Sequence, residues 1–372
     1  MKKLSFSAWL LIVFLGMFFL LFLLLPSKEY SSVEKRVLAE APTITWDSLY
    51  NGSFSEELED YLADHFPMRE FFVGVSAYWD LAAGRNGSNG VYHCRDGYLI
   101  QAPAEGSLEQ FTDNVTRFAN FAEDMGLPAT LLMVPETGYI LSDLLPASSL
   151  PYRDDEAFEI AGRVCGDLTV LDPRPLFSQL AKSQQLYYRT DHHLTSRGCY
   201  TLYSLLCLSC GRSLPEGSDY TITTCEGFRG TTCSTSGWFL TAGDSVEIWD
   251  DGTPLTVTIT EAGEEEIVTD SPFFLENLES EDMYTVFLDG NHTLVKITNP
   301  EAAGGRLLII RDSFAHCLAP FLASDYSEIL LVDLRYYRGC LSELAAEEGI
   351  TEILFVYGLG NLLSDTNSAW LF

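Results

Sequence analysis

Two short segments of this chain carry the side chains best suited to acid–base and nucleophilic chemistry. The first, residues 187–195, contains Asp191, His192 and His193, and so two of the six histidines in the sequence. In an extended segment residues i and i+2 point to the same side, so Asp191 can lie beside His193 while His192 points elsewhere. A carboxylate beside an imidazole fixes its tautomer and stabilises the imidazolium, as a general base requires.

The second segment, residues 311–316, places Ser313 just after an apolar run at residues 307–310. This pattern predicts a buried parallel strand followed by a helix, with Ser313 at the carboxyl end of the strand, where open α/β sheets bind ligands. N–H groups at the start of the helix could stabilise an oxyanion. Serine is a weak nucleophile without a base, and His193 with Asp191 would supply one.

Each segment also has a simpler interpretation. Ser313 taken alone fits a helix N-cap, a position where serine is common. Asp191, His192 and His193 taken alone fit a polar turn or, together with His316, the metal site of a hydrolase. The residues by themselves therefore leave a catalytic triad, a polar turn and a metal centre open.

The elements around these segments alternate between strands and helices. Apolar runs with the length of buried strands end near Asp172 and occupy residues 129–135, 307–310, 329–332 and 353–356. Helical spacing of apolar residues is found at residues 54–82, 111–125, 314–322 and 341–348. This alternation predicts an α/β fold with a parallel sheet flanked by helices. Asp96-Gly97 predicts a tight turn between two further strands.

Residues 219–300 differ from this pattern, because Thr, Gly and short alternating stretches there are typical of antiparallel β structure. Residues 244–283 are rich in Asp and Glu and contain no Lys or Arg. We interpret residues 219–300 as an acidic β-rich insertion whose charges face solvent. A Ca²⁺ site is the alternative, although no EF-hand or nonapeptide spacing is present.

The apolar run at residues 6–25 would form a helix about 30 Å long, the thickness of a bilayer core. It exceeds the apolar region of a cleavable signal peptide, and the nearest small-x-small pattern, Ala39 to Ala41, lies far downstream. We therefore expect a signal anchor at residues 1–26, a linker at 27–45 and one domain at 46–372, with a cleaved signal as the alternative. Lys2 and Lys3 would stay in the cytoplasm, which predicts a single-pass protein of the cell membrane with an extracellular domain.

Composition excludes some classes of protein. The net charge is −31, from 22 Lys and Arg against 53 Asp and Glu, which argues against a nucleic-acid partner. Nine cysteines fit an exported domain in which some pair, and the odd number leaves at least one unpaired. Cys207 and Cys210 have CxxC spacing without a second such pair, so a buried or disulfide-bonded state is favoured over a redox or zinc role.

Several segments resemble the bacterial DHHW family, which is related to the SGNH-like domains of periplasmic alginate O-acetylation proteins. The longest are TDHHLTSRG (190–198), LLIIRDSFAHCLAPFL (307–322) and EILLVDLRYY (328–337), with shorter ones at 33–42, 64–72, 89–100, 134–140 and 287–291. The resemblance covers most of the chain from residue 33 onward and implies an SGNH-like, flavodoxin-like sheet. It implies the triad Ser313, His193 and Asp191, with the Asp-x-His pair before the serine, permuted relative to ordinary SGNH esterases.

The resemblance also indicates weaker oxyanion or substrate-binding candidates. Residues 357–361, YGLGN, are similar to the Gly-x-Asn loop of SGNH enzymes, which makes Asn361 a candidate, and Asn291 is a second one. Arg335 could face the same crevice, with packing as the alternative. The family signature has Trp where this chain has Leu194, so an aromatic platform near the base would be lost.

Together these features predict a membrane-anchored serine O-acetyltransferase or O-acetylesterase that acts on a cell-surface polysaccharide or exopolysaccharide. We expect no cofactor and no metal; the partners would be an acetylated glycan and, by resemblance, a membrane O-acyltransferase. Candidates for stacking on sugar rings, with core packing as the alternative, are Tyr187, Tyr188, Trp238, Tyr336 and Tyr337. The rival interpretations are a non-catalytic module that binds glycan or organises an envelope complex, and a metal hydrolase.

Overall fold

The computed structural model describes residues 5–28, 30–31 and 36–371, which form two compact units. Unit 1 contains Met1–Ser88 and Ser234–Leu240, and unit 2 contains Asn89–Cys233 and Thr241–Phe372. The division therefore falls after residue 88, whereas the sequence suggested a domain that starts at residue 46. Lys2, Lys3 and part of the 33–42 segment lie outside the described residues.

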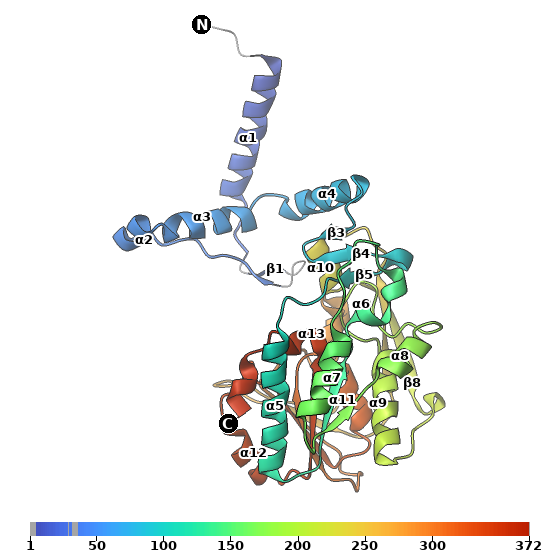
Figure 1. The fold of residues 1–372 in the computed structure, drawn as a ribbon. Helices are drawn as coiled ribbons and strands as arrows, with labels where there is room; N and C mark the ends of the chain where they lie inside the picture. The colour runs from blue at the N-terminus through green and yellow to red at the C-terminus, as the bar shows by residue number, and fades with distance from the viewer. Residues whose placement is uncertain (1–4, 29, 32–35, 372) are drawn as a thin grey trace. The chain divides into compact units, whose positions relative to one another are not determined.

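Unit 1 is mainly helical (Figure 1). Its helices are α1 (Phe6–Leu24), α2 (Trp46–Asn51), α3 (Ser53–Asp64) and α4 (Arg69–Ala82), and its short strands are β1 (Tyr30–Ser31), β2 (Arg36–Val37) and β3 (Gly87–Ser88). Helix α1 is long and apolar enough to cross a membrane, and almost all of it is exposed. The single helical stretch predicted at residues 54–82 is broken between α3 and α4, where Pro67 lacks an N–H and Met68 takes a φ of 60°.

The centre of unit 2 is an eight-stranded sheet with the order β11-β10-β12-β14-β13-β15-β6-β7. Its strands are β6 (Ala129–Val134), β7 (Thr169–Leu171), β10 (Thr256–Thr260), β11 (Ile267–Thr269), β12 (Leu294–Thr298), β13 (Arg306–Arg311), β14 (Glu328–Val332) and β15 (Glu352–Gly358). The five strands from β14 to β7 are parallel, as the sequence predicted.

The parallel strands follow the flavodoxin-like order in a permuted form. Counted from β13, the strands β14, β13, β15, β6 and β7 have the order 2-1-3-4-5, with the last two placed first in the chain. Ligands of such sheets bind where the strand order reverses, which here is between the carboxyl ends of β13 and β15. Because β6 and β7 come first in the chain, a histidine that follows β7 can come earlier in the sequence than the serine that follows β13.

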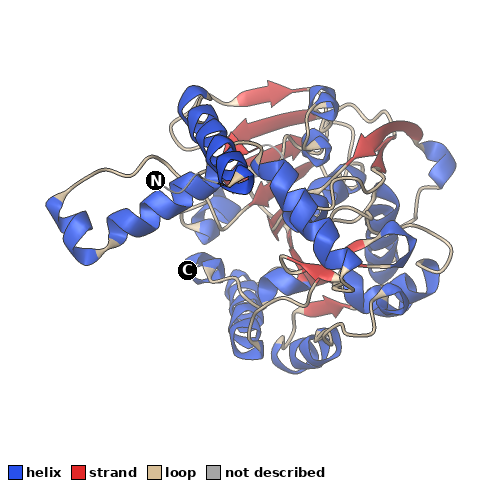
Figure 2. Cartoon of the chain, turned by 90° about the horizontal axis from the view of Figure 1, so that it is seen from above, coloured by secondary structure: helices blue, strands red, loops and turns tan. Residues whose placement is uncertain are grey.

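Helices cover both faces of this sheet (Figure 2). They are α5 (Leu108–Met125), α6 (Thr137–Ile140), α7 (Asp154–Val164), α8 (Arg174–Leu180), α9 (Ser196–Cys210), α11 (Ala315–Leu322), α12 (Leu341–Glu347) and α13 (Leu359–Leu362), while α10 (Thr231–Ser236) spans the two units. Leu307 and Ile309 of β13 pack in the core with α9 and α11, and Leu308 and Ile310 pack in the core with α5 and α12. Burial on both faces is why these strands are apolar without alternation.

The β-rich region is present but only partly separate from the sheet. Strands β8 (Thr221–Phe228) and β9 (Asp244–Asp250) form their own antiparallel pair, whereas β10, β11 and β12 extend the main sheet beyond β14. These added strands cover the edge of β14, which would otherwise expose unpaired backbone groups. The predicted turn at Asp96-Gly97 is confirmed between β4 (Val91–His93) and β5 (Leu99–Gln101), with both residues at positive φ.

Candidate active site

Ser313 lies in the short connection between β13 and α11, at the carboxyl end of the central strand. Leu307 to Ile310 of the strand before it are almost completely buried, whereas Ser313 itself is only partly buried and remains accessible to a ligand. The N–H of His316 donates to the Ser313 carbonyl at 3.2 Å, which starts the helix. Within the described part of the chain, the N–H of Ser313 donates to no protein acceptor.

Asp312 ties this connection to the end of the neighbouring strand β15. Its carboxylate accepts the N–H of Phe314 at 3.0 Å, the N–H of Gly358 at 2.8 Å and the Asn361 side-chain amide at 2.8 Å. Burial raises the pKa of Asp312, and these three hydrogen bonds oppose that rise because they favour the ionised carboxylate. Asp312 therefore sets the shape of the Ser313 connection.

His193 reaches Ser313 from a tight turn that precedes α9. Tyr188 and His193 are joined by a backbone hydrogen bond, and the next residue, Leu194, is completely buried, which anchors the turn in the core. Thr195 then caps α9 by accepting the N–H of Gly198. His193 Nε2 lies 2.8 Å from Ser313 Oγ, within hydrogen-bond distance.

Asp191 holds His193 from the other side. Its Oδ1 accepts the His193 N–H at 2.9 Å and lies 2.6 Å from His193 Nδ1. Its Oδ2 accepts the N–H and the hydroxyl of Thr231, at 2.6 and 2.9 Å. With Nδ1–H donating to the carboxylate, Nε2 is left to accept the Ser313 hydroxyl proton.

Gly230 leaves the space that Asp191 needs. A Cβ at position 230 would lie 2.2 Å from both the Cβ and the Oδ2 of Asp191. Neither Gly230 nor Thr231 was predicted from the sequence, because both come from a segment about 40 residues after Asp191 with no local pattern to connect them.

Tyr284 packs flat against the His193 ring. The two ring centroids are 3.9 Å apart, with an 11° angle between planes, and the Tyr284 hydroxyl donates to the Ser313 carbonyl at 3.2 Å. Burial raises the pKa of Tyr284 well above its usual range, so the phenol keeps its proton. Tyr284 was also missed in the sequence, where it reads as one more core aromatic.

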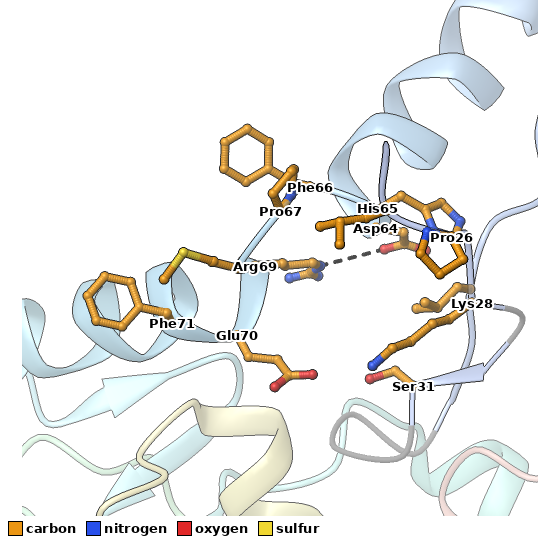
Figure 3. A pocket seen from close by; sticks show the side chains of 13 residues that line it. Pro26, Lys28, Ser31, Asp64, His65, Phe66, Pro67, Arg69, Glu70 and Phe71 are labelled. Carbon is orange, nitrogen blue, oxygen red and sulfur yellow. Dashed lines mark ion pairs between the residues drawn. The ribbon is translucent and has the colours of Figure 1, made fainter. Parts of the chain in front are cut away.

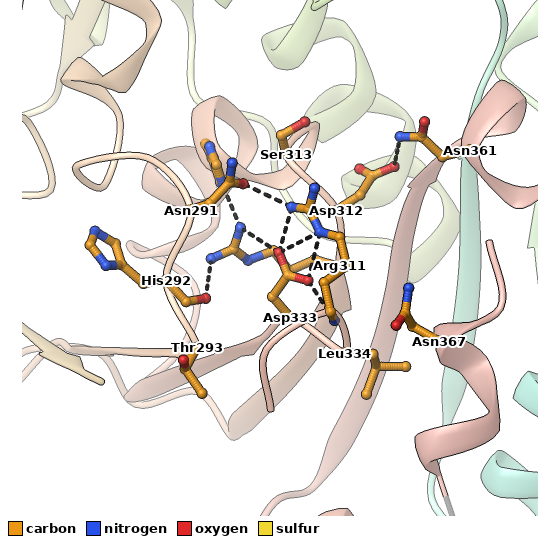
Figure 4. A network of polar contacts seen from close by, with 12 residues as sticks. Asn291, His292, Thr293, Arg311, Asp312, Ser313, Asp333, Leu334, Asn361 and Asn367 are labelled. Carbon is orange, nitrogen blue, oxygen red and sulfur yellow. Dashed lines mark hydrogen bonds and ion pairs between the residues drawn. The ribbon is translucent and has the colours of Figure 1, made fainter. Parts of the chain in front are cut away.

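Behind Ser313, buried charges form a polar network that contains two of the weaker candidates (Figure 4). The guanidinium of Arg311 is completely buried, lies 3.6 Å from the Asp333 carboxylate and contacts His316 Nε2. Arg335 pairs with Asp333 at 2.6 Å and donates to Asn291 Oδ1 at 2.8 Å. The structure therefore places Arg335 beside Asn291.

The other candidate groups are placed differently. One N–H of the Asn361 amide is used by Asp312, which leaves the second N–H of that NH₂ group for a ligand. Burial, with Arg311 as the next cause, lowers the pKa of His316 well below its usual range, so this imidazole is neutral. A cavity of about 140 Å³ lies among these side chains and is lined by Arg311, Asp312, Asp333, Leu334, Arg335, Tyr357, Asn361, Ser364 and Asp365.

Asp191, His192 and His193 each offer a potential metal ligand atom, and these atoms lie within 4.8 Å of one another. Both oxygens of Asp191 already accept hydrogen bonds from His193 and Thr231, however, and His192 Nδ1 lies 2.7 Å from the Thr231 hydroxyl. His316 is bonded to Arg311 and takes no part in this group. The hydrogen-bonding pattern therefore fits a triad better than a four-residue metal site.

Several solved structures have a fold similar to that of this chain. A DHHW family protein from Eubacterium siraeum matches with a TM-score of 0.67 at 20% identity, over 76% of this chain and 95% of that one. This chain shares the fold of that DHHW protein. PatB1 of Bacillus cereus, solved with a sulfonyl adduct, matches with a TM-score of 0.62 at 20% identity, over 73% of this chain and 97% of that one. No protein-family model and no curated protein sequence matches the chain.

The predicted relation to DHHW proteins and the predicted fold class are thus confirmed at the level of the fold. The O-acetyltransferase domain of Pseudomonas putida AlgJ matches more weakly, with a TM-score of 0.46 at 16% identity, over 76% of this chain and 97% of that one.

Two expectations from the sequence, on exposed aromatic residues and on cysteine pairing, need correction. Tyr187, Tyr188 and Trp238 are almost completely buried, so they cannot stack on a sugar, whereas Tyr336 is about half exposed. Tyr337 packs partly against the core. The expected cysteine pairing is not found, since no disulfide joins any two of the nine cysteines, all of which lie in the described residues.

Proposed function

We propose that this protein is a membrane-anchored serine O-acetyltransferase or O-acetylesterase that acts on a cell-surface polysaccharide or exopolysaccharide. The observation that carries the proposal is the unbroken row of hydrogen bonds from Ser313 Oγ through His193 to Asp191. Such a row is the arrangement that activates a serine for acyl transfer. The resemblance of the sequence to DHHW and alginate O-acetylation proteins supports acetyl as the acyl group.

In the proposed reaction, Ser313 Oγ attacks the carbonyl carbon of an acetyl ester while His193 Nε2 takes the hydroxyl proton. Asp191 stabilises the resulting imidazolium, because its carboxylate lies 2.6 Å from Nδ1. The tetrahedral intermediate then collapses, and its C–O bond to the leaving alcohol breaks as that alcohol takes the proton from His193. A sugar hydroxyl or water, deprotonated by His193, then attacks the acetyl-serine. The C–O bond to Ser313 breaks and Ser313 Oγ takes the proton back from His193, which regenerates the serine.

The negative charge on the carbonyl oxygen needs hydrogen-bond donors during these steps. The N–H of Ser313 is one candidate donor, since it has no acceptor among the described residues. The remaining amide N–H of Asn361 is a second candidate, beside the Ser313 connection, and Asn291 with Arg335 is a third.

Helix α1 supplies the proposed membrane anchor. Its 19 residues would span about 28 Å, close to the thickness of a bilayer core, and almost all of the helix is exposed. An extracellular location for unit 2, an acetylated glycan as the partner and a membrane O-acyltransferase as a further partner belong to the same proposal.

The test uses the full chain in detergent, with p-nitrophenyl acetate as the acetyl donor and neutral or acidic oligosaccharides as acceptors. We expect the protein to release p-nitrophenol, and we expect the Ser313→Ala and His193→Ala variants to lose this activity. Acetylated oligosaccharide detected by mass spectrometry would indicate a transferase, and free acetate alone an esterase. Unchanged turnover in both variants, or no turnover by a folded protein, would count against the proposal and favour a non-catalytic glycan-binding module.

A further inference from the structure

Helix α4 carries an exposed apolar stripe that contains no charged residue. At 100° per residue, Phe71, Phe72, Val75 and Trp79 fall within an arc of about 100°. Their exposed fractions are 57%, 36%, 50% and 75%. A stripe of this width normally packs against an apolar layer, yet the described residues leave most of it uncovered.

The opposite face of α4 already has its protein partner. Gly74 and Ala77 are buried, and the Ala77 carbonyl accepts the indole N–H of Trp238 at 3.2 Å. A Cβ on Gly74 would lie 3.3 Å from the Phe239 ring, so this face fits closely against residues 234–240 of unit 1. The exposed stripe is therefore a separate surface of the helix.

Helix α1 contacts the connection between α3 and α4, residues 65–68, which together with the adjoining ends of the two helices we call the elbow. Phe18 of α1 stacks on Phe66 with ring centroids 5.4 Å apart, and it meets Phe72 edge-on at 5.7 Å. Phe22 meets Tyr61 of α3 at 6.0 Å. Phe18 is only 7% exposed, although the rest of α1 is largely uncovered.

These contacts fix the depth of the elbow relative to α1. Phe18 lies six residues before Leu24, the last residue of α1, and therefore about 9 Å along the helix axis from its end. The Phe72 ring lies 5.7 Å from the Phe18 ring. Even if this whole distance ran along the helix axis towards Leu24, the Phe72 ring would still lie about 3 Å before the end of α1. If α1 spans the bilayer, Phe66 and Phe72 thus lie within its apolar layer.

The polar side of the elbow has the mixed character of a membrane surface (Figure 3). A cavity of about 470 Å³ at the end of α1 is lined by apolar groups such as Leu25 and Phe71 and by the charged side chains of Lys28, Asp64 and Glu70. Arg69 and Asp64 form an ion pair at 3.8 Å beside it. Charged and aromatic side chains meet in this way at the boundary between lipid headgroups and acyl chains.

We propose that the α3–α4 elbow lies in the outer interface of the bilayer, with the Phe71, Phe72, Val75 and Trp79 stripe among the acyl chains. The proposal rests on the membrane anchoring of α1 and is independent of the catalytic part of the proposed function. The elbow would then act as a second membrane contact beside α1, since an amphipathic helix can lie in the plane of the interface.

The test uses the full chain in bacterial membranes with p-benzoylphenylalanine introduced singly in place of Phe71, Trp79, Phe14 or Tyr336. After irradiation, mass spectrometry identifies what each position has bonded to. Phe14, about half exposed on α1, reports on the anchor, and Tyr336, about half exposed in unit 2, reports background labelling.

Phospholipid adducts at positions 71, 79 and 14, with none at 336, are the expected result. Adducts at position 14 alone would overturn the elbow proposal while leaving the anchor intact. Protein adducts at 71 and 79 would overturn it in favour of a protein partner on the stripe. An absence of lipid adducts at position 14 would refute the anchor and, with it, the elbow proposal.

Discussion

The Tyr284 ring lies parallel to the His193 imidazole, 3.9 Å away, and its hydroxyl donates to the carbonyl of Ser313. One buried side chain thus touches the proposed base through its ring and the backbone of the proposed nucleophile through its hydroxyl. Tyr284 is therefore the residue best placed to hold the distance between His193 and Ser313.

Replacing Tyr284 separates these two contacts. Tyr284→Phe keeps the stacked ring and loses one hydrogen bond, so kcat for acetyl ester hydrolysis should fall by less than about tenfold. Tyr284→Leu removes the ring and frees the imidazole, so kcat should fall by about 10²-fold with a smaller change in KM. Thermal unfolding checks that both variants fold. Equal losses of kcat in the two variants would show that the ring contact is unimportant.

Asp191→Asn tests the orientation of the base. Both oxygens of Asp191 accept hydrogen bonds, from His193 on one side and Thr231 on the other, so the NH₂ group of asparagine must face a donor in either orientation. We expect kcat to fall by about 10⁴-fold, the magnitude known for this substitution in a serine protease triad. Steady-state kinetics on a variant with an unchanged circular dichroism spectrum measures it. A loss of less than tenfold would contradict the role of Asp191.

Gly230→Ala tests the support of Asp191 without changing a polar group. The new Cβ would lie 2.2 Å from Asp191, so the carboxylate must shift and activity should drop at least tenfold. Gly162→Ala is the matched control, because a Cβ there meets no atom within 4 Å. Similar activity in the two variants would mean that the position of Asp191 is not critical.

Two buried carboxyl groups make the stability of unit 2 depend on pH. Burial, followed by repulsion from Asp154, raises the pKa of Glu136 to about 7, and burial raises that of Asp154 to about 7. Between the ordinary pKa, 4.5 for Glu136 and 3.8 for Asp154, and the raised pKa in the folded protein, the folded state holds protons that the unfolded state has released. Stability should therefore be fully present below pH 4 and decline as the pH rises towards 7.

Urea unfolding at pH 5 and pH 8 measures this decline. Glu136→Gln cannot ionise at position 136, so it should lose less stability between the two pH values than the unmodified protein, with the remainder due to Asp154. Glu105→Gln removes an equal charge at an exposed position and should show the full decline. An identical decline in both variants would rule out Glu136 as its source.

The sequence predicted the parallel strands because their residues are buried on both faces. Leu307 to Ile310, for instance, can be read as a strand from their length and branching alone. The sequence also predicted that Asp191 lies beside His193, because their i, i+2 spacing is local. Ser313 followed from its position after a strand.

The remaining contacts could not be predicted from the sequence because they join distant segments. Thr231 and Tyr284 reach the site from the region first interpreted as a separate insertion, and no spacing pattern connects either to His193. Phe18 of α1 stacks on Phe66, in the connection between α3 and α4, and hydrophobic periodicity cannot distinguish such a contact from packing on the sheet.

The proposed function depends on Ser313 acting as a nucleophile that His193 activates, and a covalent label on the serine probes this role. The full chain would be treated with phenylmethanesulfonyl fluoride and analysed by intact-mass and peptide mass spectrometry. We expect one sulfonyl adduct, on Ser313, that is absent in Ser313→Ala and forms far more slowly in His193→Ala. No adduct on the folded protein, or an adduct that persists in Ser313→Ala, would contradict it.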